Sequence, residues 1–195
     1  MGAAQGRKDR NLNTGDTVSI LGSITPDDLG GRGKPLPNTK YRGTIESATI
    51  SPETNGTRLV LQVGQLTTPE GATEIAGLNG DAPYRIGNRK VFVREWTDHQ
   101  NEQATDIGRK RIKQLLVATG LVAKPEKGQS VEVPFQTFEE VAGAVTGRSF
   151  MFTSKQTRRK TRSTDRTGQE VYVDAFESDG ETPKIDVEVA VFHAP

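Results

Sequence analysis

The chain has 195 residues, with 26 basic and 25 acidic side chains, so its formal net charge is only +1. Its length suits one domain with appendages, because a chain of this size can bury a sizeable hydrophobic core. It has no cysteine and only two histidines, which excludes disulfide scaffolds, cysteine-based zinc sites, iron–sulfur clusters and thiol nucleophiles.

The first 39 residues carry little hydrophobic periodicity. Val18, Ile20 and Leu21 indicate one short strand, and the stretch over 27–37 is rich in glycine and proline, which is typical of a linker. The sequence therefore predicts an arm over residues 1–39, flexible or laid over the surface, and one domain over residues 40–195.

Strand-like patterns begin at residue 40. Residues 41–51 and 57–66 are rich in β-formers, and Pro52 followed by Asn55-Gly56 between them predicts a hairpin. Residues 67–87 are predicted to be a loop outside the core, and residues 88–97 a third strand.

Two helices are expected next. Asn101 is a suitable N-cap and Gly120 a suitable C-terminal stop for the first helix. Its predicted apolar stripe consists of Ala104, Ile107, Ile112, Leu115, Leu116 and Thr119. The capping box from Thr137 to Glu140 predicts a second, shorter helix that runs to Gly147.

Three more strands are indicated at 149–155, 170–177 and 185–193, so about seven strands surround one inserted helix. A doubly wound sheet would need alternating strands and helices, which this pattern lacks. The predicted fold class is mainly β: a partly open Greek-key β-barrel with one inserted amphipathic helix and a second short helix.

The most informative segment lies at 155–166, where six basic residues stand against the single acid Asp165. They are Lys155, Arg158, Arg159, Lys160, Arg162 and Arg166. Because strand-like runs flank the segment, it is interpreted as the tip of a β-hairpin over 153–170. A flexible basic finger without apolar side chains can lie along a phosphate backbone. The alternative is a solvated loop that balances acids elsewhere.

A second feature is the predicted strand that ends at Thr97. Alternation places Lys90, Phe92, Arg94 and Trp96 on one face, with Val91 and Val93 on the other. Flat rings spaced by cations suit single-stranded nucleic acid, since every base can stack and every phosphate needs a cation. The alternative is that the arm or the helix covers both rings. A weaker repeat of the pattern comprises Arg148, Phe150 and Phe152, although adjacent phenylalanines on one face also suit a core.

Asp98, Glu102 and Asp106 are spaced by four residues, which places them on one helical face, and such a row of acids suits a magnesium-dependent nuclease. Acids at a helix start are also explained by the helix dipole. We therefore expect no enzyme activity, no catalytic residues, no metal and no cofactor. The acidic start of this helix also argues against sequence-specific reading of duplex DNA.

The order of these features resembles a known family. The matching stretches are 41–46 (YRGTIE), the Asn55-Gly56 turn, 89–92 (RKVF), 98–101 (DHQN), 107–109 (IGR), 115–120 (LLVATG), and 138–147 running into an arginine-rich hairpin. Over about residues 40–177 the chain resembles phage-encoded single-stranded-DNA-binding proteins of replication and recombination modules. The resemblance implies an oligonucleotide-binding (OB) barrel and no catalytic residues.

The sequence therefore predicts non-sequence-specific single-stranded DNA binding in phage DNA replication and recombination. The expected partners are single-stranded DNA and a phage recombinase or replication protein, and the oligomeric state is left open. Without an apolar run of about 18 residues or a signal-like N-terminus, we expect no membrane association and a place in the cytoplasm of the bacterial host. The alternative function is a virion structural or decoration protein with an interlacing arm.

Overall fold

The computed structural model describes residues 35–76, 83–177 and 180–194, and residues 35–195 belong to one compact unit. The short strand predicted near Val18 and most of the predicted arm lie outside the described residues. No helix in the described part of the chain is long and apolar enough to span a membrane.

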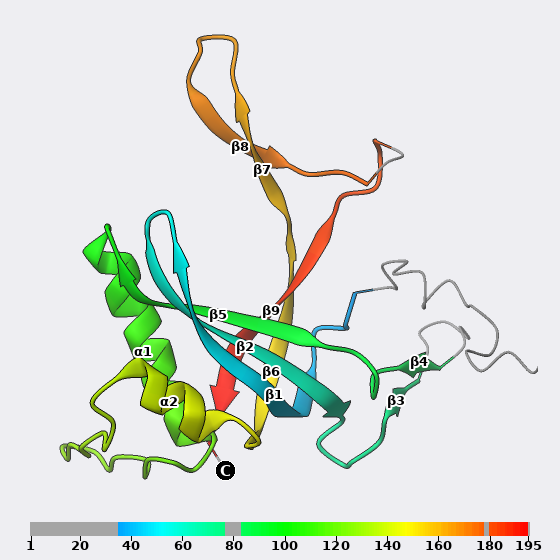
Figure 1. Cartoon of the computed structure of the whole chain (residues 1–195). Coiled ribbons are helices and arrows are strands. Elements are labelled where there is room, and N and C mark those ends of the chain that lie inside the picture. The colour runs from blue at the N-terminus through cyan, green and yellow to red at the C-terminus, as the bar shows by residue number, and fades with distance from the viewer. Residues whose placement is uncertain (1–34, 77–82, 178–179, 195) are drawn as a thin grey trace, which may run out of the picture. The chain divides into compact units, whose positions relative to one another are not determined.

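A five-stranded antiparallel sheet forms the body of this unit (Figure 1). Its strands are β1 (Lys40–Glu53), β2 (Gly56–Thr67), β5 (Val91–His99), β6 (Ser149–Arg158) and β9 (Ile185–His193), in the order β5-β2-β1-β6-β9. The first three strands form a meander and β6 returns beside β1, which is the Greek-key arrangement. The predicted fold class is confirmed: the structure is mainly β, with two helices and a barrel that is not closed.

The β1–β2 turn forms where the sequence predicts it. The ladder runs to the pair Glu53 and Gly56, which leaves Thr54 and Asn55 as the connecting residues. Gly56 has φ +149°, and a β-carbon there would lie 2.2 Å from the carbonyl oxygen of Asp98 on β5. Glycine is therefore needed both for the turn conformation and for the close contact with the neighbouring strand.

Alternating residues of the five strands fill the core. Tyr41, Leu61, Val93 and Phe152 are buried there, each from a different strand. Phe150 is buried as well, 5.5 Å from Phe152 between ring centroids. Of the two interpretations of Arg148, Phe150 and Phe152, the core interpretation is confirmed for both phenylalanines, and only Arg148 is exposed.

Residues 35–39, which the sequence assigns to the arm, lie against β6. Leu36 is buried in the core, and the carbonyl oxygen of Pro37 accepts hydrogen bonds from the Tyr41 hydroxyl (2.9 Å) and the Ser154 hydroxyl (2.6 Å). The backbone N–H of Gln156 donates to Oδ1 of Asn38 at 2.6 Å. These contacts fix the entry of the chain into β1.

The segment predicted as a loop over 67–87 contains two short strands, β3 (Glu74–Ile75) and β4 (Tyr84–Arg85), which pair with each other. Ile86, directly after β4, is fully buried. The placement of this segment outside the core is therefore wrong at Ile86.

Helix α1 (Glu102–Ala118) has the predicted ends, with the Asn101 side chain as N-cap and Gly120 at φ +70°. Its predicted stripe is partly wrong, because Ile107 is 53% exposed whereas Thr105 and Gly108 are buried. A β-carbon on Gly108 would lie 2.1 Å from the carbonyl oxygen of Trp96. The helix backbone therefore rests directly on β5, and this contact turns the helix so that Ile107 faces outward.

Two arginines of α1 contact the edge strands of the open sheet, and one of them, Arg111, connects both edges. Arg109 Nε donates to the carbonyl oxygen of Thr97 on β5 at 3.0 Å. Arg111 Nε donates to the carboxylate of Glu95 on β5 at 2.6 Å, and its other two nitrogens donate to the carbonyl oxygens of Val189 (2.5 Å) and Ala190 (3.1 Å) on β9. Polar groups on an open sheet edge thus gain partners from the helix.

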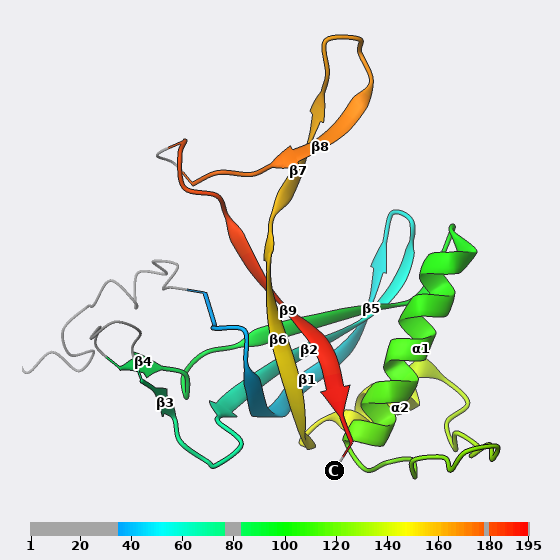
Figure 2. The same cartoon turned by 180° about the vertical axis from the view of Figure 1, so that it is seen from behind.

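Helix α2 (Phe138–Val145) begins with the predicted capping box between Thr137 and Glu140. After β6, strands β7 (Lys160–Thr164) and β8 (Glu170–Asp174) form a separate two-stranded hairpin that extends beyond the sheet (Figure 2). The predicted hairpin partner of the 149–155 strand is wrong: β6 pairs with β9, and the region around Glu170 pairs with β7 instead.

Candidate functional site

The outer face of β2 and β5 carries the predicted rings and cations. The register pairs Arg58 with Trp96, Val60 with Arg94, and Gln62 with Phe92. As the alternation predicts, Val91 and Val93 are buried while Phe92 is 51% exposed and Arg94 is exposed. We call this surface the β2–β5 face; it comprises the six paired residues above.

Trp96 is partly covered by neighbours that the sequence analysis did not include. The guanidinium carbon of Arg58 lies 3.7 Å from the indole centroid, and the His99 ring centroid lies 4.3 Å away. Arg58 Nε is 3.3 Å from a carboxylate oxygen of Glu53, but it forms no hydrogen bond with any described residue. Arg58 therefore covers part of the indole, and Phe92 is the more open ring.

A carboxylate lies at the other end of the β2–β5 face. Lys90 Nζ is 3.0 Å from Oε2 of Glu46, and Gln62 Nε2 donates to the same oxygen at 2.8 Å. The hydrogen bond from Gln62, followed by that from Lys90, lowers the pKa of Glu46. Lys90 is thus already paired, whereas Arg94 has no ion pair with any described residue.

The basic segment is more ordered than a flexible finger. Lys155 and Arg158 belong to β6, Lys160 and Arg162 belong to β7, and only Asp165–Gln169 form the tip. At the tip, the Asp165 carboxylate accepts hydrogen bonds from the Thr167 hydroxyl and from the backbone of Thr167 and Gln169, which lowers its pKa. From the sequence, the segment is interpreted as the tip of a hairpin; most of it instead forms the strands β6 and β7, and the tip covers only residues 165–169.

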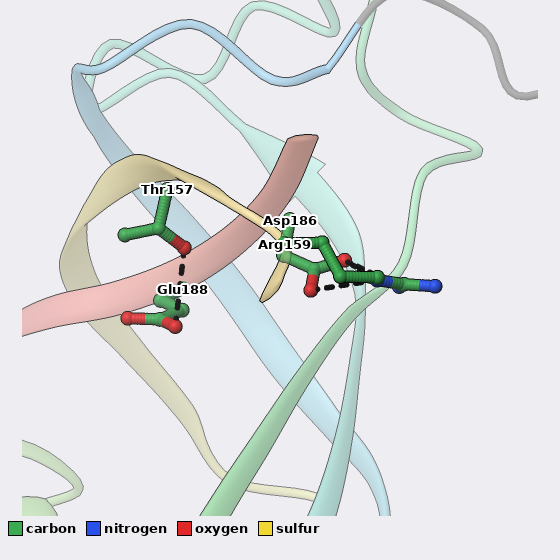
Figure 3. Close-up of polar contacts among 4 residues, drawn as sticks. All are labelled: Thr157, Arg159, Asp186 and Glu188. Atoms are coloured by element: carbon green, nitrogen blue, oxygen red, sulfur yellow. Dashed lines mark hydrogen bonds and ion pairs between the residues drawn. The ribbon is translucent and has the colours of Figure 1, made fainter. Parts of the chain in front are cut away.

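Half of the basic residues in this segment face carboxylates. Arg158 pairs with Asp174 at 3.0 Å and Arg162 with Glu170 at 3.1 Å. Arg159 forms a two-pronged ion pair with Asp186 on β9 (Figure 3). In the same view the Thr157 hydroxyl donates to Glu188 at 3.1 Å.

The remaining cations of the segment are exposed and form no ion pair with described residues. They are Lys155, Lys160 and Arg166, and Arg148 at the start of β6 is similar. The predicted site residues thus form two groups, one on the β2–β5 face and one along β6 and the β7–β8 hairpin.

The acids that motivated a nuclease do not form a metal site. Asp98 lies on β5, whereas Glu102 and Asp106 lie on α1, and all three are exposed. In the ranges that the structure describes, no group of three histidines or acids is placed to hold a metal ion.

Sequence reasoning missed Arg58, Gln62 and Glu46 as members of this surface. The signal was present for the first two, because Leu59, Leu61 and Val63 define the core side of β2 and place Arg58 and Gln62 outside. Their contacts with Trp96 and Glu46 depend on strand pairing, which the sequence alone does not give.

The β2–β5 face thus carries the open ring of Phe92, the Trp96 ring partly covered by Arg58, and Arg94, which is unpaired among the described residues. The segment along β6 and the β7–β8 hairpin adds cations without an ion pair to described residues. Such a surface can stack flat molecules and neutralise anionic groups. It requires neither a metal nor a catalytic group for this. A comparison with protein-family models and with curated proteins found no match to the chain.

Proposed function

We propose that this protein binds single-stranded DNA without sequence specificity. The observation that carries the proposal is the alignment of Phe92, Arg94 and the Arg58–Trp96 stack on the outer face of β2 and β5. These are the second and third strands of a partly open Greek-key barrel. In OB barrels this face and the loops between strands 1–2 and 4–5 bind oligonucleotides.

The hairpin position supports the same proposal. β7 and β8 lie between the fourth and fifth strands of the sheet, so their free cations occupy the corresponding connection. Bases would stack on Phe92 and on the Arg58–Trp96 pair, while Arg94, Lys155, Lys160 and Arg166 neutralise phosphates. From the family resemblance, we further propose a role in phage DNA replication and recombination, in the bacterial cytoplasm, beside a recombinase or replication protein.

The first test is a titration of fluorescently labelled oligo-dT at several salt concentrations, followed by anisotropy. Contacts of the four free cations with about four phosphates give a slope of about −3 for log K against log salt. Mixed-sequence oligonucleotides should bind similarly, and an oligo-rU arm measures the preference for DNA over RNA. Absent or salt-insensitive binding contradicts the proposal.

Phe92→Ala should weaken binding about tenfold without changing the salt slope, because stacking contributes about 1–3 kcal/mol per base. Ile107→Ala is the matched control, since Ile107 on α1 is similarly exposed but lies off the β2–β5 face. Equal effects of the two substitutions would rule out the β2–β5 face as the stacking surface.

Neutralising Lys155, Lys160 and Arg166 to glutamine should reduce the magnitude of the salt slope by about 2, at about 0.7 per phosphate contact. Lys124→Gln with Lys127→Gln, in the exposed connection between the helices, is the control and should leave the slope unchanged. Arg158, Arg159 and Arg162 should contribute less, because each must first leave its carboxylate partner.

A further inference from the structure

The β7–β8 hairpin presents a tyrosine that the proposed function does not use. Tyr172 is 65% exposed and lies opposite Arg162 in the ladder. Lys160 lies two residues from Arg162 and therefore points to the same side of the hairpin. The opposite side carries Thr161, Ser163, Val171 and Val173.

Much of the Tyr172 side chain is open to solvent. A hydrogen bond with Tyr172, together with the charge of Glu170, raises the pKa of Arg162. Arg162 pairs with Glu170 at 3.1 Å. Two neighbouring strands with both faces exposed have no core in which to bury an aromatic ring.

This arrangement repeats the chemistry of the β2–β5 face. There, Phe92 alternates with Arg94 on one side of a strand; here, an exposed ring has Arg162 opposite it and Lys160 on the same side, where Glu170 and Asp174 also lie. Arg162 pairs with Glu170, so Lys160 is the cation of this side without an ion pair to a described residue. A ring beside such a lysine suits an unpaired base with its phosphate better than it suits an apolar protein surface, because the charged groups would have to be desolvated against such a surface.

We propose that Tyr172 is a second base-stacking platform, on which a single strand longer than the β2–β5 face continues along the hairpin beside Lys160. This inference rests on the proposed function and deepens it, since it assigns the direction in which the bound strand leaves the barrel. Short strands would occupy the β2–β5 face alone, and long strands would occupy both platforms.

The test compares oligo-dT of about 5 and about 16 nucleotides, which span the usual site sizes of one OB barrel. Tyr172→Ala should raise the Kd of the longer oligonucleotide about fivefold or more and leave that of the shorter one unchanged. Tyr172→Phe, which keeps the ring, should bind both like the wild type. Val173→Ala is the matched control on the other side of the hairpin, and Phe92→Ala should weaken both lengths.

The outcomes separate this inference from the function on which it rests. If Tyr172→Ala leaves the longer oligonucleotide unaffected while Phe92→Ala weakens both, the second platform is wrong and the proposed function stands. Equal losses for Tyr172→Ala and Val173→Ala would mean that the hairpin acts through its overall shape, which also overturns the platform. A wild-type protein that binds neither length overturns both proposals.

Discussion

The buried side chain of Tyr41 makes the stability of the sheet depend on pH. Its ring lies 5.7 Å from that of Phe152, and its hydroxyl donates to the carbonyl oxygen of Pro37. Burial raises the pKa of Tyr41 to about 12, from an ordinary value of 10.0. The unfolded chain ionises first, so the stabilisation from the neutral phenol is complete below pH 10 and is lost as the pH rises towards 12.

The expected result is a fall in the free energy of unfolding between about pH 9 and about pH 11.5, measured by urea titration. Tyr41→Phe should be less stable at the lower pH, because Pro37 loses a hydrogen bond, but its stability should fall less between the two values. An equally steep fall in the variant would assign the alkaline effect to other groups.

At the level of elements, the contact between α1 and β5 depends on Gly108, which has no side chain. A β-carbon on Gly108 would meet the Trp96 backbone oxygen at 2.1 Å and nitrogen at 2.7 Å, and backbone cannot move aside as a side chain can. Gly108→Ala should therefore lower the free energy of unfolding by about 1–3 kcal/mol, despite the better helix propensity of alanine.

Gly143 in α2 provides the matched control, since a β-carbon there meets nothing within 4 Å. Gly143→Ala should raise the free energy of unfolding by about 0.5–1 kcal/mol in the same urea titrations. A stabilising Gly108→Ala would show that the helix lies further from β5 than described.

At the level of the whole molecule, Arg111 connects the two edges of the open sheet through Glu95 on β5 and two carbonyl oxygens on β9. Burial raises the pKa of Glu95, and the hydrogen bond from Arg111 opposes that rise. Arg111→Met should lower the free energy of unfolding by about 3 kcal/mol, because it leaves a buried carboxylate without its cation.

Arg109→Met on the same helix is the comparison, and it should lower the free energy of unfolding by only about 1 kcal/mol, because Arg109 donates to one carbonyl group. Urea unfolding of both variants measures the difference. Equal losses would mean that the link between β5 and β9 adds nothing beyond a single hydrogen bond.

Local signals predicted much of this structure. The Asn55-Gly56 turn, the Asn101 cap, the Thr137–Glu140 box and the outward side of β5 each depend on a few neighbouring residues, and each is present. Non-local features were predicted less well. Ile107 points outward because Gly108 meets a strand distant in sequence, which no helical periodicity reveals.

In the candidate site, the free charge of the basic segment also depends on non-local strand pairing that the sequence does not reveal. The positive charge of the 155–166 segment is evident from composition, but its neutralisation is not. Asp186 meets Arg159 only because β6 pairs with β9 rather than with the strand that follows next. A cluster of arginines in a sequence therefore overstates the free charge when strand pairing supplies the carboxylates.

The position of Trp96 has a practical consequence. It is the single tryptophan of the chain, so all indole emission comes from one point on the β2–β5 face. Arg58 and His99 lie against that ring, and any ligand that shifts them alters the surroundings of the fluorophore. Intrinsic tryptophan fluorescence of the unlabelled protein therefore reports directly on ligand binding at the β2–β5 face.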